Sequence, residues 1–311
     1  WFSRESLLLA NNVVLMASVA AVLLGTLYPL FIDALGLGKL SVGPPYFNAV
    51  FVPLITPALF LMGVGALARW KGDSLPDMAV RLRWALGVAV ATGLLLPLTL
   101  DGYEPWAVLG LGAATWIALT VLIAFRERVK SLRQLASLPR AFWGMHLAHL
   151  GMAVGVAGIT MVVNYEKELD VRMNVGDQVQ MAGYTLTFMG VEQYQGPNFR
   201  GTRGSVVVKE DGDKQFVLRP EKRIYDASGS VMTEAAVRPS AFSDLYVSLG
   251  EPLNNELTTW AVRLYYKPFV NWLWLGALLM VAGGFLAAFD RRYRVAARER
   301  AAAGAAAAQG A

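Results

Sequence analysis

The sequence predicts a polytopic α-helical membrane protein with about six transmembrane helices and one small all-β extracytoplasmic domain, inserted between the last two helices. Three observations predict this class. Hydrophobic residues make up 55% of the chain and charged residues only 16%, against about a quarter charged in soluble domains. The apolar residues form long unbroken runs, which an unusually apolar soluble α/β protein would not need. The composition then changes abruptly near residue 165.

Six apolar runs are long enough to cross a membrane. A helix rises about 1.5 Å per residue, so about 20 apolar residues cross a hydrocarbon layer of roughly 30 Å. The candidate spans are 6–32, 46–68, 82–100, 105–125, 141–163 and 269–289. They divide the chain into a membrane domain at 1–164, a β-domain at 165–266, a last helix at 267–290 and a basic, Ala-rich tail at 291–311. Because the chain begins at Trp1 without an initiator Met or a cleavable signal, we expect it to be part of a longer polypeptide.

The basic residues of the short loops predict the orientation, because Lys and Arg collect in cytoplasmic loops. The loops 69–83 and 126–140 and the tail are basic, whereas 33–45 and 101–104 are nearly free of Lys and Arg. Six spans with this alternation place both chain ends in the cytoplasm and the long loop outside. The net charge of +5 is then a topology signal, and no nucleic acid is predicted as a partner.

Short alternating runs predict the strands of the outer domain. The runs are 178–181, 184–190, 205–209, 215–218 and 260–265, with Gly-containing breaks at 182–183, 195–197 and 211–213. Short strands in a domain of this size favour a small sandwich or barrel. The domain contains no His, and its composition favours binding or docking.

The chain contains no Cys. The sequence therefore excludes structural disulfides, thiol–disulfide chemistry by this chain and any Cys-based metal site.

Both histidines, His146 and His149, fall in the fifth span. An intramembrane ionisable residue is costly and predicts a functional site. The spacing of three residues places the two rings about one helical turn apart, and the small residues Gly144, Ala148 and Gly151 would let a flat ligand or another helix approach. The residues alone leave three interpretations open: axial ligation of a haem iron, a proton relay, or hydrogen bonds that only hold the bundle together.

The first span carries Arg4, Glu5, Asn11 and Asn12 near its predicted cytoplasmic start. Interfacial snorkelling and helix–helix hydrogen bonds explain these residues better than a substrate role.

Short blocks along the chain carry a family resemblance. They are FSRESLLL at 2–9 with Asn11–Asn12, GTLYP at 25–29, SVGPPYFN at 41–48, NY at 164–165, DVRM at 170–173, GPN at 196–198, MTEA at 232–235, DLYVSLGE at 244–251 and WAVRLYYKPFV at 260–270. In this order they resemble the C-terminal half of the CcmF family of cytochrome c-type biogenesis proteins.

The resemblance implies a component of a haem lyase in the bacterial inner (plasma) membrane, with the β-domain periplasmic. Such a lyase attaches haem covalently to a Cys-x-x-Cys-His apocytochrome c at the outer face. The family also implies a transmembrane haem b that reduces the incoming haem, with quinol as a possible electron donor. His149, followed by Leu150–Gly151, aligns with the family's axial ligand of the haem iron, and His146 is the alternative.

The resemblance further implies partners and contacts. The partners are membrane lipid, a missing N-terminal half or companion chain, the haem chaperone CcmE, apocytochrome c and the thioreduction and docking subunits CcmH and CcmI. The family's tryptophan-rich motif, outer His ligands and second transmembrane His belong to the missing half. Candidates for contacts with haem propionates or partner carboxylates are Arg172, Arg219, Arg223 and Lys267, with plain surface charge as the alternative. A non-catalytic scaffold that docks chaperone and apocytochrome, or a haem or solute transporter, are the alternative functions.

Overall fold

The computed structural model describes residues 3–135, 137–210 and 214–290. The chain divides into a helical unit, Trp1–Val156 with Leu275–Ala311, and a second unit, Ala157–Trp274, which holds the β-domain. The predicted tail at 291–311 and the predicted break at 211–213 lie outside the described residues.

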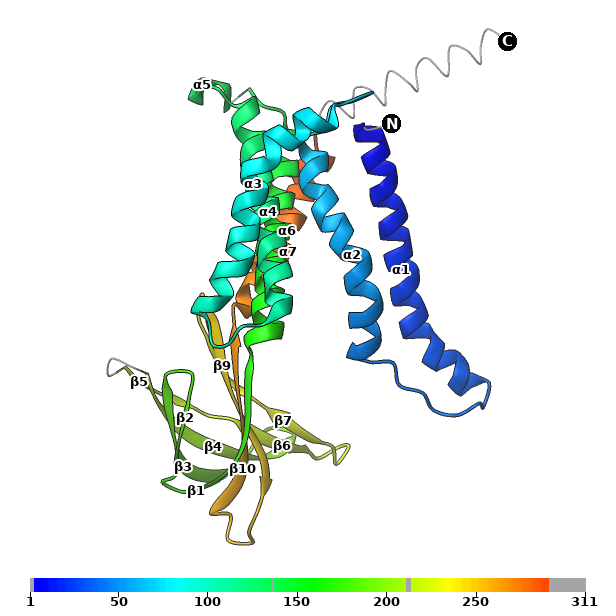
Figure 1. The fold of residues 1–311 in the computed structure, drawn as a ribbon. Coiled ribbons are helices and arrows are strands. Elements are labelled where there is room, and N and C mark those ends of the chain that lie inside the picture. Colours follow the sequence, from blue (N-terminus) through cyan, green and yellow to red (C-terminus); the bar gives the residue numbers. More distant parts are fainter. Residues whose placement is uncertain (1–2, 136, 211–213, 291–311) are drawn as a thin grey trace. The chain divides into compact units, whose positions relative to one another are not determined.

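Six of the described helices are long and apolar enough to span a membrane, which confirms the helical part of the predicted fold class (Figure 1). The helices, in chain order, are α1 (Arg4–Ala34), α2 (Pro44–Leu67), α3 (Leu75–Leu95) continued by the short 3₁₀ helix η1 (Leu96–Thr99), α4 (Pro105–Arg128), the short α5 (Leu132–Leu135), α6 (Arg140–Tyr165) and α7 (Val270–Ala288).

Local sequence signals set where these helices begin. The Ser3 side chain accepts a hydrogen bond from the Ser6 N–H at the start of α1, and Ser74 does the same for Asp77 in α3. Proline lies in the first turn of α2, α3 and α4, where its missing N–H costs no helical bond. Because Ser74 caps α3, this helix begins before the predicted span, and its basic residues Arg81 and Arg83 belong to the helix rather than to a loop.

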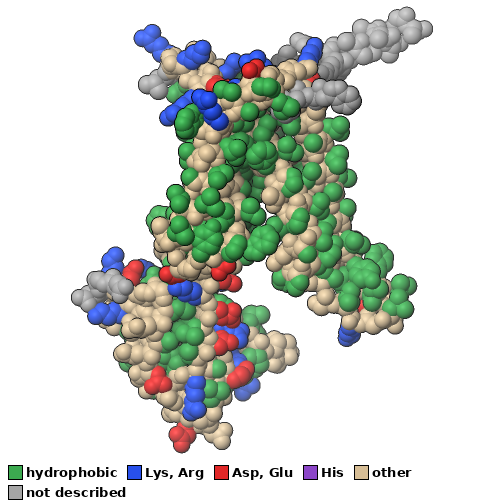
Figure 2. Space-filling view, viewed as in Figure 1, with side chains coloured by type: hydrophobic (Ala, Val, Ile, Leu, Met, Phe, Trp, Pro, Cys, Tyr) green, Lys and Arg blue, Asp and Glu red, His purple; other side chains and the backbone are tan. Residues whose placement is uncertain are grey.

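Basic side chains gather at one end of the helical unit, above a surface of apolar side chains (Figure 2). Arg81 forms an ion pair with Glu127 of α4 at this end. An apolar helix surface bounded by charged side chains is the pattern that a lipid environment requires.

The helical unit packs closely through aromatic and small residues. Trp116 of α4 stacks on Phe60 of α2, with ring centroids 5.1 Å apart, and donates a hydrogen bond to the Phe60 carbonyl oxygen at 3.0 Å. Helices α6 and α7 approach at glycines: a Cβ added to Gly283 would lie 2.5 Å from the Ala148 N and 2.6 Å from the Gly144 O. Glycine is required at such a contact because two backbones meet there.

The β-domain consists of two antiparallel sheets that share one core. Its strands are β1 (Lys167–Asn174), β2 (Gln178–Met181), β3 (Tyr184–Gln195), β4 (Phe199–Glu210), β5 (Gln215–Leu218), β6 (Glu221–Tyr225), β7 (Val231–Glu234), β8 (Ala236–Pro239), β9 (Ser243–Pro252) and β10 (Thr259–Pro268). One sheet has the order β1-β10-β9-β8, and the other has the order β2-β3-β4-β6-β7 with β5 paired to β4. Fully buried side chains from both sheets, such as Phe188, Val206, Leu249 and Leu264, form the core. Inward residues from two facing sheets make this a β-sandwich.

The first and last strands of the domain are neighbours. Lys167 of β1 lies opposite Tyr266 of β10, and the pairing continues to Asn174 opposite Thr259. The chain therefore leaves α6 and returns to α7 along one antiparallel ladder.

Candidate functional site

Helix α6 carries both histidines, and each is oriented by the same local contact. The Nδ1–H of His146 donates to the Phe142 carbonyl oxygen at 2.8 Å, and that of His149 to the Met145 carbonyl oxygen at 2.9 Å. A carbonyl oxygen only accepts, so in the neutral ring the proton lies on Nδ1 and Nε2 keeps its lone pair. Both rings thus present Nε2 as a potential ligand or acceptor.

His146 is enclosed by aromatic side chains. Its exposed fraction is 6%, and its ring centroid lies 4.0 Å from that of Phe142 and 5.7 Å from that of Phe125. Its buried Nε2 has no hydrogen-bond partner among the described residues. The His146 ring is therefore packed in the interior of the helical unit, among aromatic rings.

His149 instead borders a cavity of about 220 Å³ between α1, α2 and α6. Most of the lining side chains are apolar, and the polar ones come from α1 and α6. The lining residues are Arg4, Leu7, Leu8, Asn11, Leu61, Met62, Gly65, Ala66, Met145 and His149. An apolar cavity with a few converging polar groups is the usual form of a ligand site.

Arg4 reaches this cavity from the first turn of α1. Its guanidinium lies 5.2 Å from the centroid of the Trp70 ring, and its backbone N–H donates to the Arg69 carbonyl oxygen at 3.0 Å. The neighbouring Glu5 turns its carboxylate to the backbone N–H of Lys71 at 3.0 Å. The start of α1 is thereby fixed to the connection between α2 and α3.

His149 and the apolar walls of this cavity fit one face of a haem. A neutral imidazole with its Nδ1–H held by a backbone carbonyl is the usual state of a metal-ligating His, and the apolar walls suit a flat macrocycle. His149 would provide one nitrogen ligand to the haem iron. Among the described residues there is no cluster of three or more His, Asp or Glu that could hold a metal ion.

A second cavity of about 290 Å³ lies between α2, α3 and α4. Thr56 and Trp116 are its polar residues, and none of its lining side chains titrates. Trp116 already donates to the Phe60 carbonyl, so this cavity offers little for chemistry.

The structure does not bring the four predicted cationic residues of the β-domain together. Arg172 is exposed on β1, and Arg219 is exposed just after β5. Lys267 pairs with Glu166 at 3.2 Å, and Arg223 of β6 pairs with Glu221 and Glu234. Arg172 and Lys267 belong to one sheet, whereas Arg223 belongs to the other.

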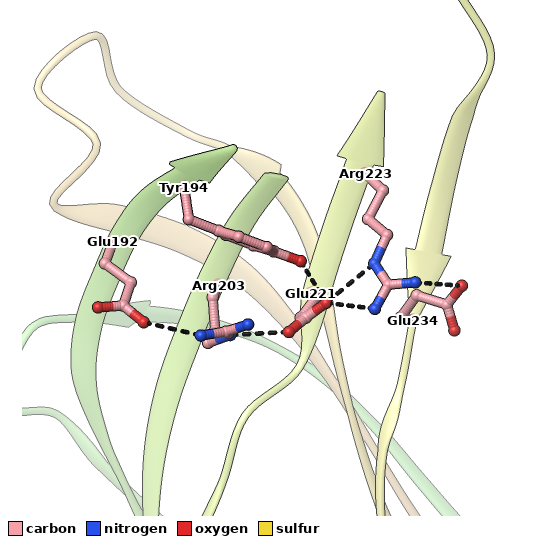
Figure 3. A network of polar contacts seen from close by, with 6 residues as sticks. All are labelled: Glu192, Tyr194, Arg203, Glu221, Arg223 and Glu234. Carbon is pink, nitrogen blue, oxygen red and sulfur yellow. Dashed lines mark hydrogen bonds and ion pairs between the residues drawn. The ribbon is translucent and has the colours of Figure 1, made fainter. Parts of the chain in front are cut away.

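Arg223 is part of a polar network across four strands (Figure 3). The Glu221 carboxylate accepts hydrogen bonds from the Tyr194 hydroxyl at 2.5 Å, from Arg203 at 2.7 Å and from Arg223 at 2.6 Å. Arg203 also lies 3.4 Å from Glu192. Burial raises the pKa of Glu221, but the hydrogen bonds from Tyr194, Arg223 and Arg203 outweigh it and hold this pKa at about 2. The network stabilises the sheet, and sequence reasoning missed it.

Comparisons with known proteins identify relatives of this chain. Residues 164–268 match the family described as CcmF C-terminal beta-sandwich. The chain is 45% identical to the cytochrome c-type biogenesis protein CcmF of Pseudomonas aeruginosa over 96% of its own length and 46% of that protein's. It is 46% identical to the CcmF of Escherichia coli K12 over 94% of its own length and 45% of that protein's. The chain thus spans about half the length of these curated relatives.

A solved structure titled "Cytochrome c Heme Lyase CcmF" shares the fold. It superimposes with a TM-score of 0.75 and 24% identity, over 93% of this chain and 46% of that one. At this identity the likeness concerns the fold.

Proposed function

Because this chain belongs with the CcmF-type cytochrome c biogenesis proteins, we propose that it is part of a haem lyase and that His149 is an axial ligand of its transmembrane haem b. The lyase would attach haem to the two thiols of a Cys-x-x-Cys-His apocytochrome c at the outer face of the membrane. The remaining half, on the same polypeptide or a companion chain, would provide the second axial ligand and the outer haem-binding residues.

The observation that carries the proposal is the environment of His149. Its Nδ1–H is held by the Met145 carbonyl, and its ring borders the cavity between α1, α2 and α6. His146 has the same backbone contact but lies among aromatic rings. Only His149 therefore combines a fixed tautomer with space for a ligand.

When bound, a haem b at this site would supply an electron to the incoming haem iron, with quinol as the proposed donor. The residues of this chain would hold and shield it. The Met145 carbonyl fixes the imidazole orientation, which raises the basicity of the ligand. Apolar side chains such as Leu7, Leu61 and Met62 line the cavity, which favours an apolar macrocycle.

The β-domain is proposed as the docking surface for haem chaperone CcmE, apocytochrome c and the subunits CcmH and CcmI, on the periplasmic side of the inner membrane. Arg172 and Arg219 are exposed and form no ion pair with the described residues, so they suit partner carboxylates or haem propionates. Arg223 and Lys267 are engaged within the domain and are weaker candidates.

The test is the absorption spectrum of the complete protein, both halves present, as wild type, His149→Ala and His146→Ala. We expect the bis-imidazole haem b bands to disappear in His149→Ala and to persist in His146→Ala. If both variants keep the bands, the histidines are structural and haem chemistry does not involve this chain. Loss in His146→Ala alone would reassign the ligand.

A scaffold is the second candidate function, favoured by a β-domain that has its own core and sheet ladders. The same spectra decide between the two functions. Absence of haem from the wild type, with binding of chaperone and apocytochrome retained, would support the scaffold.

A further inference from the structure

We propose that Arg4 binds a carboxylate of the haem whose iron His149 coordinates. This contact would fix the orientation of the haem in the cavity. The proposal rests on the proposed function and adds a second anchor to it. An Arg–carboxylate contact is planar and bidentate, which suits the propionate edge of a haem.

Arg4 and His149 line the same cavity. Arg4, Leu7, Leu8 and Asn11 line the cavity together with His149. Their spacing of three, four and seven residues from Arg4 puts them on one face of α1. Arg4 of α1 and His149 of α6 could therefore contact the same bound molecule.

Arg4 brings a positive charge to this cavity. Arg4 is half-buried, and no carboxylate among the described residues pairs with it. The carboxylates of Glu5 and Asp73 accept hydrogen bonds from backbone groups: Glu5 from Lys71, and Asp73 from Arg69 and Ser74. No acidic residue lines the cavity. A half-buried cation beside apolar walls is stabilised by an anion, and this cavity gives it one only when a ligand is present.

Two contacts hold Arg4 in place. The backbone N–H of Arg4 donates to Arg69, and the guanidinium lies over the ring of Trp70. Both contacts come from the connection between α2 and α3. This arrangement holds the guanidinium near one position, as a specific contact requires.

A phospholipid headgroup could also bring an anion to Arg4, since a phosphate binds guanidinium as a carboxylate does. The placement of Arg4 and His149 on one cavity favours the carboxylate of a single bound molecule. The experiment separates the two sources by using a haem that lacks free carboxylates.

The experiment titrates haem b and haem b dimethyl ester into the complete, haem-depleted protein, followed by the absorption bands. The variants are Arg4→Gln, Arg4→Lys and Arg83→Gln. Arg83 is a matched control because its guanidinium also lies over a tryptophan ring, that of Trp84 at 5.7 Å, but it does not line the cavity.

We expect wild type and Arg83→Gln to bind haem b about 10- to 100-fold more tightly than the ester, the range for one charge-assisted hydrogen-bonded contact. Arg4→Gln should lose this preference, and Arg4→Lys should keep part of it. If Arg4→Gln and wild type show the same preference for haem b over the ester, the proposal is overturned. This includes the case in which Arg4→Gln loses co-purified phospholipid and keeps the preference. Unchanged haem binding in His149→Ala would overturn the assignment of His149 and the Arg4 anchor together, whereas failure of Arg4 alone leaves His149 in place.

Discussion

Glu221 shows at the scale of single residues how the β-domain depends on ionisation. Its pKa in the folded protein is about 2, against an ordinary value of 4.5. A carboxyl whose pKa is lowered by folding stabilises the fold above its unfolded pKa, and this contribution is lost as pH falls through the folded pKa. The stabilisation by Glu221 is therefore complete above about pH 4.5 and decreases towards pH 2.

We expect Glu221→Gln to lower the free energy of unfolding of the β-domain by about 1–3 kcal/mol at neutral pH, because it removes charged hydrogen-bond acceptors. Hydrogen exchange of strands β4 and β6 in the whole protein measures this loss. The thermal midpoint of the variant should also depend less on pH below about 4.5 than that of wild type.

Asp170→Asn is the matched control, since Asp170 also pairs with an arginine, Arg263 at 2.6 Å, and a hydrogen bond from it lowers the Asp170 pKa. That pair is exposed, so we expect little effect on the midpoint. Equal losses in both variants would contradict a special role for Glu221.

The sequence could single out the histidines but not their surroundings. Two histidines in one span stand out by themselves, because such residues are costly in lipid. Whether each borders a cavity or aromatic rings depends on how α6 meets the other helices. The Glu221 network likewise depends on strand register: Arg203 lies opposite Glu192 and Glu221, and Glu221 lies opposite Glu234. The spacing of these residues along the chain does not predict that they lie side by side across the strands.

At the scale of elements, the helices could be predicted more readily than the strands. A span is marked by its own length and hydropathy. Strands β7 and β8 have mostly exposed side chains, so the alternation that marks a half-buried strand is absent there. Strands β2 and β5 follow it, and they occupy the predicted ranges 178–181 and 215–218.

The contact between α6 and α7 gives a prediction at this scale. Gly283→Val should destabilise the helix pair by about 1–3 kcal/mol through overpacking, because even a Cβ would approach the backbone of Ala148 and Gly144. Gly284→Val adds the same side chain next to it, where no atom lies within 4 Å of an added Cβ. Thermal unfolding in detergent should therefore separate the two variants, and equal midpoints would contradict the close contact.

At the scale of the whole molecule, orientation remains a prediction of the basic loops. The absence of Cys allows a direct test. Ser228→Cys, exposed in the β-domain, should react with a membrane-impermeant maleimide in intact spheroplasts. Ser131→Cys, exposed between α4 and α5, should react only after permeabilisation. The reverse pattern would invert the topology.

The ladder between β1 and β10 also bears on how such a chain could arise. Because Lys167 and Tyr266 are opposite one another, the chain enters the β-domain and leaves it through two neighbouring strands. Without these strands, a short turn would join α6 to α7 as an ordinary helical hairpin. The β-domain therefore has the form of a cassette, which a single genetic insertion could add and which grafting between relatives could exchange without rebuilding the membrane helices.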